Sequence, residues 1–220
     1  MFEQSAPYYD EFYSFLDYGA AAESLCGLIA ERHPHARTLL DVACGTGRYL
    51  EYLAPRFAAE GLDILPSLLE TARRRCPGLP FHQGDMMAFD LGRRFDVVTC
   101  LFCSIGYAVT LDNAERAIAR MADHLEPGGL LVVEPWVTPE MCWTHRVTSE
   151  VLDRPDLKVV RMHTHERAGR TSVFDIHYLV GTPERVAHFV EREVMGLFTR
   201  EEYLAAFRKA KIEQIGTIFV

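Results

Sequence analysis

The stretch Leu39-Leu40-Asp41-Val42-Ala43-Cys44-Gly45-Thr46-Gly47 decides the fold of this chain. Its first half carries the apolar residues of a buried strand, its second half is a turn of small residues, and residues 48–57 then follow a helical pattern. Glycines in such a turn let a ligand approach the backbone N–H groups at the positive end of the helix dipole. The sequence therefore predicts a nucleotide-binding corner between a strand and a helix.

The turn is a G-x-G motif, and Leu50 stands where the dinucleotide-binding motif G-x-G-x-x-G has its third glycine. This difference argues against a nicotinamide-dependent dehydrogenase, which is the second interpretation among enzymes. Asp63 ends the next apolar stretch, 18 residues after Gly45. A carboxylate there can accept hydrogen bonds from both ribose hydroxyls of a nucleoside ligand, although an aspartate with only a loop role has the same spacing.

Strands and helices alternate along the first part of the chain. Strands are expected at 38–43, 58–63, 79–82, 95–102 and 130–134, and helices at 20–32, 48–57, 66–75 and 112–125. Such alternation predicts an α/β fold with a doubly wound, mostly parallel sheet of the Rossmann-like type. The run at 95–102 is almost continuously apolar, as in a strand that is covered on both faces.

The pattern changes after Trp136. Residues 157–165, 171–180 and 186–198 are expected as antiparallel strands, a capping box at 199–202 opens a helix over 201–209, and two last strands are expected at 211–215 and 216–220. We therefore divide the chain into a core with an N-terminal lid, formed by residues 1–136 and 196–220, and an antiparallel β-rich insertion, residues 137–195, that binds the substrate.

Composition narrows the function. The 220 residues carry a net charge of −8, which argues against nucleic acid as a partner, and no apolar run approaches the roughly 20 residues of a membrane span. The N-terminus has no signal-peptide pattern, and the six cysteines lack zinc-like pairing, so we expect reduced thiols, a cytoplasmic location and no metal. The expected partner is a small molecule, and the acidic charge would allow a homodimer.

The corner motif, Asp63, Gly84-Asp85-Met86 and Pro127-Gly128-Gly129 together resemble the class I S-adenosylmethionine-dependent methyltransferases. The resemblance implies S-adenosylmethionine as cofactor and residues 1–18 as a lid over it. In that family the acidic residue after the third strand accepts from the adenine amino group and the next residue offers its backbone N–H. The cofactor contacts implied for this chain are Tyr18, Asp41, Ala43, Gly45, Gly47, Asp63, Ile64, Asp85, Met86 and Leu101. A turn role for Asp85 and a packing role for Tyr18 are the alternatives.

The acceptor should meet the cofactor at the carboxyl ends of the parallel strands. Transfer from an activated sulfonium methyl requires alignment, exclusion of water and management of one proton, without a metal. Tyr107, His163 and Tyr178 are the candidate catalytic residues, and each has a packing role as its alternative. The candidates for substrate binding are Phe102, Glu134 and Trp136.

A narrower resemblance is to bacterial enzymes of antibiotic biosynthesis that dimethylate the amine of a dTDP-linked deoxyamino sugar. It rests on FHQGDM (81–86), DLGRRF (90–95), FCSIGY (102–107), HLEPGG (124–129), VVEPW (132–136) and LFTREEY (197–203). The glycine-rich C-terminal loop of that family is absent here, and its Trp-Trp-Phe-Pro-Glu is replaced by residues 136–140, Trp-Val-Thr-Pro-Glu. C- or N-methylation of an indole or another small amine, and a catalytically silent cofactor-binding protein, are the alternatives.

Overall fold

The computed structural model describes residues 4–212 of the chain. Its first unit is a five-stranded parallel sheet in the order β3-β2-β1-β4-β5. The strands are β1 (Thr38–Val42), β2 (Ala58–Asp63), β3 (Phe81–Gln83), β4 (Phe95–Cys100) and β5 (Leu125–Val133). The expected α/β fold with a doubly wound parallel sheet is therefore present.

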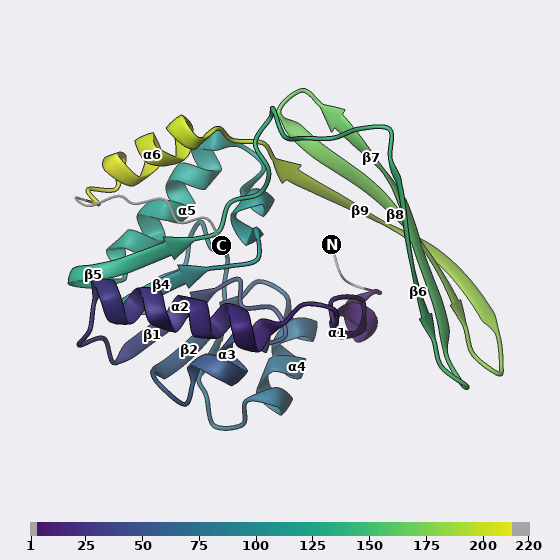
Figure 1. The fold of residues 1–220 in the computed structure, drawn as a ribbon, viewed down its shortest axis with the longest axis horizontal. Coiled ribbons are helices and arrows are strands. Elements are labelled where there is room, and N and C mark those ends of the chain that lie inside the picture. Colours follow the sequence, from purple (N-terminus) through teal and green to yellow (C-terminus); the bar gives the residue numbers. More distant parts are fainter. Residues whose placement is uncertain (1–3, 213–220) are drawn as a thin grey trace.

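Helices cover both faces of this sheet (Figure 1). On one face α2 (Tyr18–Arg32), α3 (Arg48–Leu53) and α4 (Pro66–Arg75) enclose an apolar core with Leu39 and Val97. On the other face α5 (Leu111–Asp123) and α6 (Arg200–Lys209) pack over Leu40 and Val98. The burial of both faces explains why the run at 95–102 is almost continuously apolar.

A second, antiparallel sheet has the order β6-β7-β8-β9. It contains β6 (Val147–Asp153), β7 (Lys158–Ala168), β8 (Thr171–Gly181) and β9 (Val186–Gly196). The three strands β7 to β9 were predicted, whereas β6 was not. In β6 the inward positions are Thr148, Glu150 and Leu152, so the strand lacks the apolar alternation by which half-buried strands are recognised.

The N-terminal segment lies between the two sheets (Figure 1). It forms a short 3-10 helix, η1 (Ala6–Tyr8), and one turn of helix, α1 (Tyr9–Phe12), before α2 begins at Tyr18. Phe12 is buried against the second sheet in a cluster with Tyr178 and Phe174. The Asp17 side chain caps α2 by accepting from the Ala20 N–H at 2.9 Å.

Two expected boundaries were wrong by several residues. Helix α3 ends at Leu53 instead of residue 57, and β5 begins at Leu125 instead of residue 130. Leu125 pairs with Phe95, and the following Pro-Gly-Gly stretch is taken up as an irregularity before Leu130 pairs with Val97. The strands expected at 211–215 and 216–220 lie, apart from residues 211 and 212, outside the described residues.

Candidate active site

The turn after β1 is built from positive-φ residues. Ala43, Gly45 and Gly47 have φ values of 59°, 55° and 76°. A Cβ on Gly47 would lie 3.2 Å from the Cβ of Ala72, so this glycine also brings helix α4 close to the turn. This geometry exposes the backbone at the start of α3, the arrangement predicted for a nucleotide-binding corner.

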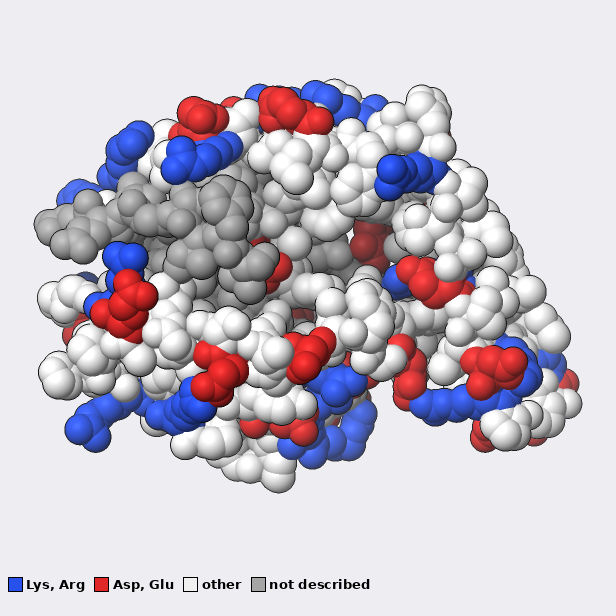
Figure 2. Space-filling model, viewed as in Figure 1, with Lys and Arg blue, Asp and Glu red and all other residues white. Residues whose placement is uncertain are grey.

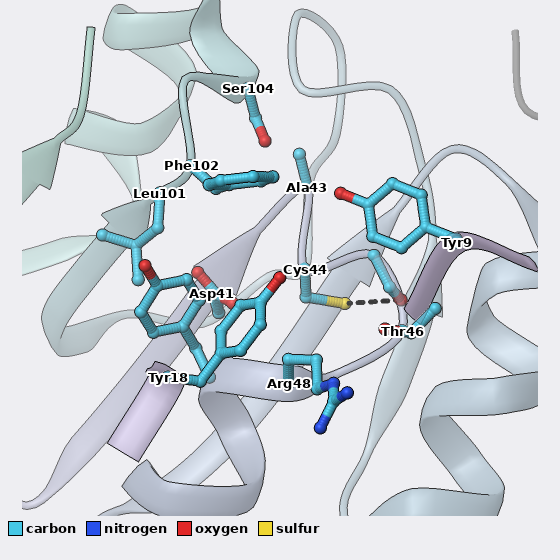
Figure 3. A pocket seen from close by; sticks show the side chains of 12 residues that line it. Tyr9, Tyr18, Asp41, Ala43, Cys44, Thr46, Arg48, Leu101, Phe102 and Ser104 are labelled. Atoms are coloured by element: carbon cyan, nitrogen blue, oxygen red, sulfur yellow. Dashed lines mark hydrogen bonds between the residues drawn. The ribbon is translucent and has the colours of Figure 1, made fainter. Parts of the chain in front are cut away.

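A pocket that is partly open to solvent lies against this turn. Figure 3 shows the rings of Tyr9, Tyr18 and Phe102 on different sides of it. These rings come from the N-terminal segment, from α2 and from the end of β4, so segments that are distant in the sequence form one aromatic wall. The full lining is Tyr9, Tyr18, Asp41, Ala43, Cys44, Gly45, Thr46, Arg48, Tyr49, Leu101, Phe102 and Ser104.

Asp41 is the acidic group of the pocket. Asp41 is 2% exposed, and one of its carboxylate oxygens accepts a hydrogen bond from the Thr99 hydroxyl at 2.7 Å. Burial raises its pKa to about 7, because the charged form loses hydration that the hydrogen bond from Thr99 replaces only in part. A cationic ligand group in this pocket would therefore stabilise the carboxylate.

Asp63 holds the turn in place from β2. Its Oδ2 accepts from the Gly45 N–H and its Oδ1 from the Leu65 N–H, both at 2.8 Å. Burial raises its pKa, while the backbone N–H groups oppose this effect. Each carboxylate oxygen has a second lone pair, so these bonds leave acceptor capacity for a ribose.

The N-terminal segment is fastened over the turn by Asp10. Its carboxylate accepts from the Thr46 hydroxyl at 2.6 Å and forms an ion pair with Arg75 at 2.6 Å. Tyr13, from the same segment, lies edge-on against Phe102 with ring centroids 5.2 Å apart. The segment thus touches both the turn and the end of β4, as a lid over the pocket would.

The predicted cofactor residues divide into two groups. Tyr18, Asp41, Ala43, Gly45 and Leu101 line the pocket, whereas Gly47, Asp63, Ile64, Asp85 and Met86 lie outside its lining. The Asp85 carboxylate accepts from the Met87 N–H at 2.8 Å, which is the turn role considered as its alternative. Ile64 is 49% exposed, and Met86 packs against the core beside the sheet.

On the acceptor side, Tyr107 lies in the 3-10 helix η2 (Ser104–Ala108), directly after β4. Its hydroxyl donates to Oε2 of Glu193 in β9 at 3.0 Å. Burial, followed by the nearby Glu193 carboxylate, raises the pKa of Tyr107 well above its usual value. The candidate residue Tyr107 is therefore joined to the second sheet by a polar contact.

The other two candidate catalytic residues share the inner face of the second sheet. His163 in β7 pairs with Ile176 in β8, and Arg161 pairs with Tyr178, so their side chains point to the same face. Nδ1 of His163 is buried without a hydrogen-bond partner, and burial lowers the pKa of this histidine. Tyr178 is 1% exposed and is stacked on Phe189 at 4.8 Å.

The predicted substrate-binding residues follow the carboxyl ends of β4 and β5. Phe102 lines the pocket, and its N–H donates to the Glu134 carboxylate at 2.6 Å. Trp136 packs edge-on against Phe174 with centroids 6.1 Å apart, and its indole N–H is buried without a partner. The structure therefore brings Phe102 and Glu134 together beside the pocket, whereas Trp136 contacts the second sheet and lies outside the pocket lining.

Three groups near the site were missed by the sequence analysis: Tyr9, Asp10 and the pair Glu191 and Glu193. The pair left a signal, because two glutamates flank Arg192 in a strand whose alternate residues are apolar. In the structure Glu191 accepts from the Gln4 N–H at 2.8 Å and from the Ser5 hydroxyl. It therefore holds the N-terminal segment against the second sheet.

Comparison with known proteins now identifies the family. A family model for a methyltransferase domain matches residues 39–129. The chain is 41% identical over 209 residues to the dTDP-3-amino-3,4,6-trideoxy-alpha-D-glucopyranose N,N-dimethyltransferase of Streptomyces venezuelae, which covers 93% of this chain and 88% of that protein. This chain belongs to that methyltransferase family.

Two further similarities extend over most of the methyltransferase. It is 40% identical over 197 residues to the dTDP-4-amino-2,3,4,6-tetradeoxy-D-glucose N,N-dimethyltransferase of Saccharopolyspora spinosa, covering 89% of this chain and 79% of that protein. The S-adenosylmethionine-bound structure of CalS10, an amino pentose methyltransferase from Micromonospora echinaspora, is 39% identical with a TM-score of 0.83, covering 92% and 87% of the two chains. The expected fold, enzyme class and cofactor are thereby confirmed.

The described part of the chain lacks two other types of site. Within residues 4–212 no helix is both long enough and apolar enough to cross a membrane. The same residues hold no group of three or more His, Cys, Asp or Glu side chains placed to bind a metal ion.

Proposed function

We propose that this methyltransferase acts on a small molecule and transfers methyl groups to the amine of a nucleotide-linked deoxyamino sugar. The observation that carries the proposal is the 41% identity over 93% of the chain to an enzyme named for that reaction. The relatives differ in whether the amine is on C3 or C4 of the sugar. The acceptors to be tested therefore carry the amine at either position.

The residues present fit S-adenosylmethionine. A cationic amino group would give the buried Asp41 carboxylate the partner that its raised pKa indicates it lacks. The open backbone at Ala43 and Gly45, and the further acceptor capacity of Asp63, suit the nucleoside part. We assign the adenine to Asp85 and Met86, with Ile64 beside it; Tyr18 and Leu101 contact the cofactor, and Gly47 sets the turn.

When bound, the cofactor supplies an activated methyl group, so the protein must align the acceptor and keep water out. The lid, fastened by Asp10 to Thr46, would exclude water from the pocket. Phe102, Glu134 and Trp136 would hold the acceptor between the pocket and the second sheet. Tyr107, His163 and Tyr178 are proposed to orient the amine and receive its proton.

The division of labour follows the two sheets. We assign cofactor binding to residues 1–136 and 196–220, and substrate binding to residues 137–195. Support comes from the inner face of the second sheet, where His163 and Tyr178 are presented toward the parallel-sheet unit and the lid. The indole alternative requires the same cofactor site but no binding of a sugar nucleotide.

Transfer of labelled methyl from S-adenosylmethionine tests the proposal. The acceptors are dTDP-linked sugars with an amine at C3 or at C4, and indole-type amines. Methylation of a sugar amine, with product masses for one or two added methyl groups, is the expected result. Methylation of only an indole would overturn the acceptor assignment, and cofactor binding without turnover on any acceptor would favour a catalytically silent protein.

We also propose that the protein forms a homodimer and is located in the cytoplasm. The outer face of the second sheet exposes a set of apolar side chains that a second copy would cover: Val147, Val151, Met162, Leu179, Val186 and Val190. The six cysteines are all free, as in a reducing compartment. Sedimentation of the protein and of a Leu179→Lys variant tests the dimer, since the charge should dissociate it; a wild type that sediments as a monomer would exclude it.

A further inference from the structure

Glu193, next to the proposed acceptor site, has one carboxylate oxygen that receives no hydrogen bond. The residue is 7% exposed, and its Oε2 accepts from the Tyr107 hydroxyl at 3.0 Å. Its other oxygen, Oε1, is buried and has no hydrogen-bond partner. A buried polar atom without a hydrogen-bond partner is costly, and more so in a charged group, so this oxygen calls for an explanation.

The charges on the inner face of the second sheet do not supply a partner. Among the described residues the charged side chains on this face are Glu150, Arg161, Arg167, Glu191 and Glu193. Arg161 is held by Glu150 through two hydrogen bonds of 2.9 Å, and Glu191 is occupied by the N-terminal segment. Arg167 lies exposed near the end of β7. When all five groups are ionised, the face has an excess of one negative charge, which favours a cationic ligand.

The place of this carboxylate connects it with the cofactor pocket. Tyr107 belongs to η2, whose first residue, Ser104, lines the pocket. The negative charge of Glu193 contributes to the raised pKa of both Tyr107 and Tyr9, and Tyr9 also lines the pocket. Figure 2 shows acidic side chains at the hollow between the parallel-sheet unit and the second sheet. An acceptor that reaches the pocket from this hollow would pass Glu193.

We infer that Glu193 recognises the acceptor amine as an ammonium ion and removes its proton before methyl transfer. The inference rests on the proposed function, because only an amine acceptor arrives with this charge. An amine of ordinary basicity is protonated near pH 7 and has no lone pair for attack. An indole or a hydroxyl acceptor would bring no positive charge to Oε1.

The ammonium N–H gives its proton to Oε1, which leaves a neutral amine and a carboxylic acid. The amine nitrogen forms a bond to the methyl carbon while the methyl–sulfur bond breaks, and the electron pair of that bond stays on sulfur. Glu193 releases its proton to water, and the resulting methylammonium can return to the same oxygen for a second transfer.

The surroundings of the carboxylate suit this role. Burial raises the pKa of Glu193. The pKa of the carboxyl group is then closer to that of the substrate ammonium group, so the proton transfer becomes less unfavourable. The Tyr107 hydroxyl fixes the carboxylate through Oε2, so Oε1 keeps one orientation. Because the contact spans β9 and η2, the group is held by two packed elements.

The experiment compares Glu193→Gln with Arg192→Gln as a matched control. Glutamine keeps the shape and can still accept from Tyr107, whereas it cannot take a proton. Arg192 is the next residue of the same strand, points to the outer face, and its side chain is 64% exposed. Both variants are assayed for methyl transfer to the amino sugar from pH 6 to pH 10, and for cofactor binding.

We expect Glu193→Gln to lower kcat/KM about 10²- to 10⁴-fold at pH 7, as for loss of a general base. The loss should shrink as the pH passes the pKa of the substrate amine, while the Kd for the cofactor stays within twofold of wild type. At pH 7 the variant should also lose preference for the amino sugar nucleotide over its hydroxyl analogue in equilibrium binding. Arg192→Gln should match the wild type throughout.

Three results would overturn the inference. Wild-type kcat/KM in Glu193→Gln at pH 7 would remove the residue from the reaction while leaving the proposed function intact. An equal loss at every pH, with weaker binding of both analogues, would mean that the side chain is structural. If the wild-type enzyme methylated only an uncharged acceptor such as an indole carbon, the proposed function would fail and this inference with it.

Discussion

Replacement of Asp41 by Asn should make the protein more stable at alkaline pH, although the residue is buried in the cofactor pocket. Burial raises the pKa of Asp41 from 3.8 to about 7, so the folded state keeps a proton that the unfolded chain releases above pH 4. The folded state therefore binds more protons between about pH 4 and pH 7, and stability falls as the pH rises through that window. A pKa difference of this size corresponds to roughly 4 kcal/mol at pH 8.

Urea denaturation at pH 4.5, 6 and 8 measures this effect, with wild type and Asp41→Asn compared at each pH. The amide still accepts from the Thr99 hydroxyl, so the variant keeps the hydrogen bond and lacks only the charge. Its free energy of unfolding relative to wild type should rise by roughly 2–4 kcal/mol from pH 4.5 to pH 8. A difference that stayed constant with pH would refute the reasoning.

Asp96→Asn is the matched control with the opposite sign. The Asp96 carboxylate accepts from the Arg37 and Thr38 N–H groups at 2.8 and 2.9 Å, and these bonds lower its pKa even though partial burial acts against them. Its stabilisation is present above the unfolded pKa and is lost as the pH falls. Asp96→Asn should therefore destabilise the protein at pH 8, and the difference from wild type should shrink in acid.

Three further predictions test the local structure. Gly61→Ala should cost about 1–3 kcal/mol of unfolding free energy in urea titrations, because its Cβ would lie 2.7 Å from the Cys44 sulfur; an unchanged midpoint would show that the neighbours relax freely. Thr199→Ala should cost about 1 kcal/mol by the same measurement, since it breaks the capping box with Glu202 at the start of α6; equal stability would remove the box from the account of this helix. Asp63→Ala should weaken S-adenosylmethionine binding in calorimetry by about 1–3 kcal/mol, through lost hydrogen bonds to the ligand and to the turn; unchanged affinity would exclude the residue from the site.

The parallel-sheet unit could be predicted because its signals are local. The strand, the glycine turn and Asp63 follow one another within a short stretch, and the covered strands are continuously apolar. What local patterns could not show was packing between distant segments. Asp10 meets Thr46 and Arg75 only after the N-terminal segment has folded over the turn. The lid was expected from the resemblance, whereas its fastening had no signal in the sequence.

The acceptor side depends on strand register, which the sequence does not specify. A shift of one residue in β9 would turn Glu193 to the solvent and bring Arg192 to the inner face, because side chains alternate along a strand. The observed pairing of Glu193 with Phe174 places the carboxylate on the same face as His163 and opposite Tyr107. The role proposed for Glu193 therefore depends on two contacts, with Phe174 and with Tyr107, that lie far apart along the chain. The same dependence predicts that a residue inserted into the turn between β8 and β9 would separate Glu193 from Tyr107 while leaving cofactor binding intact.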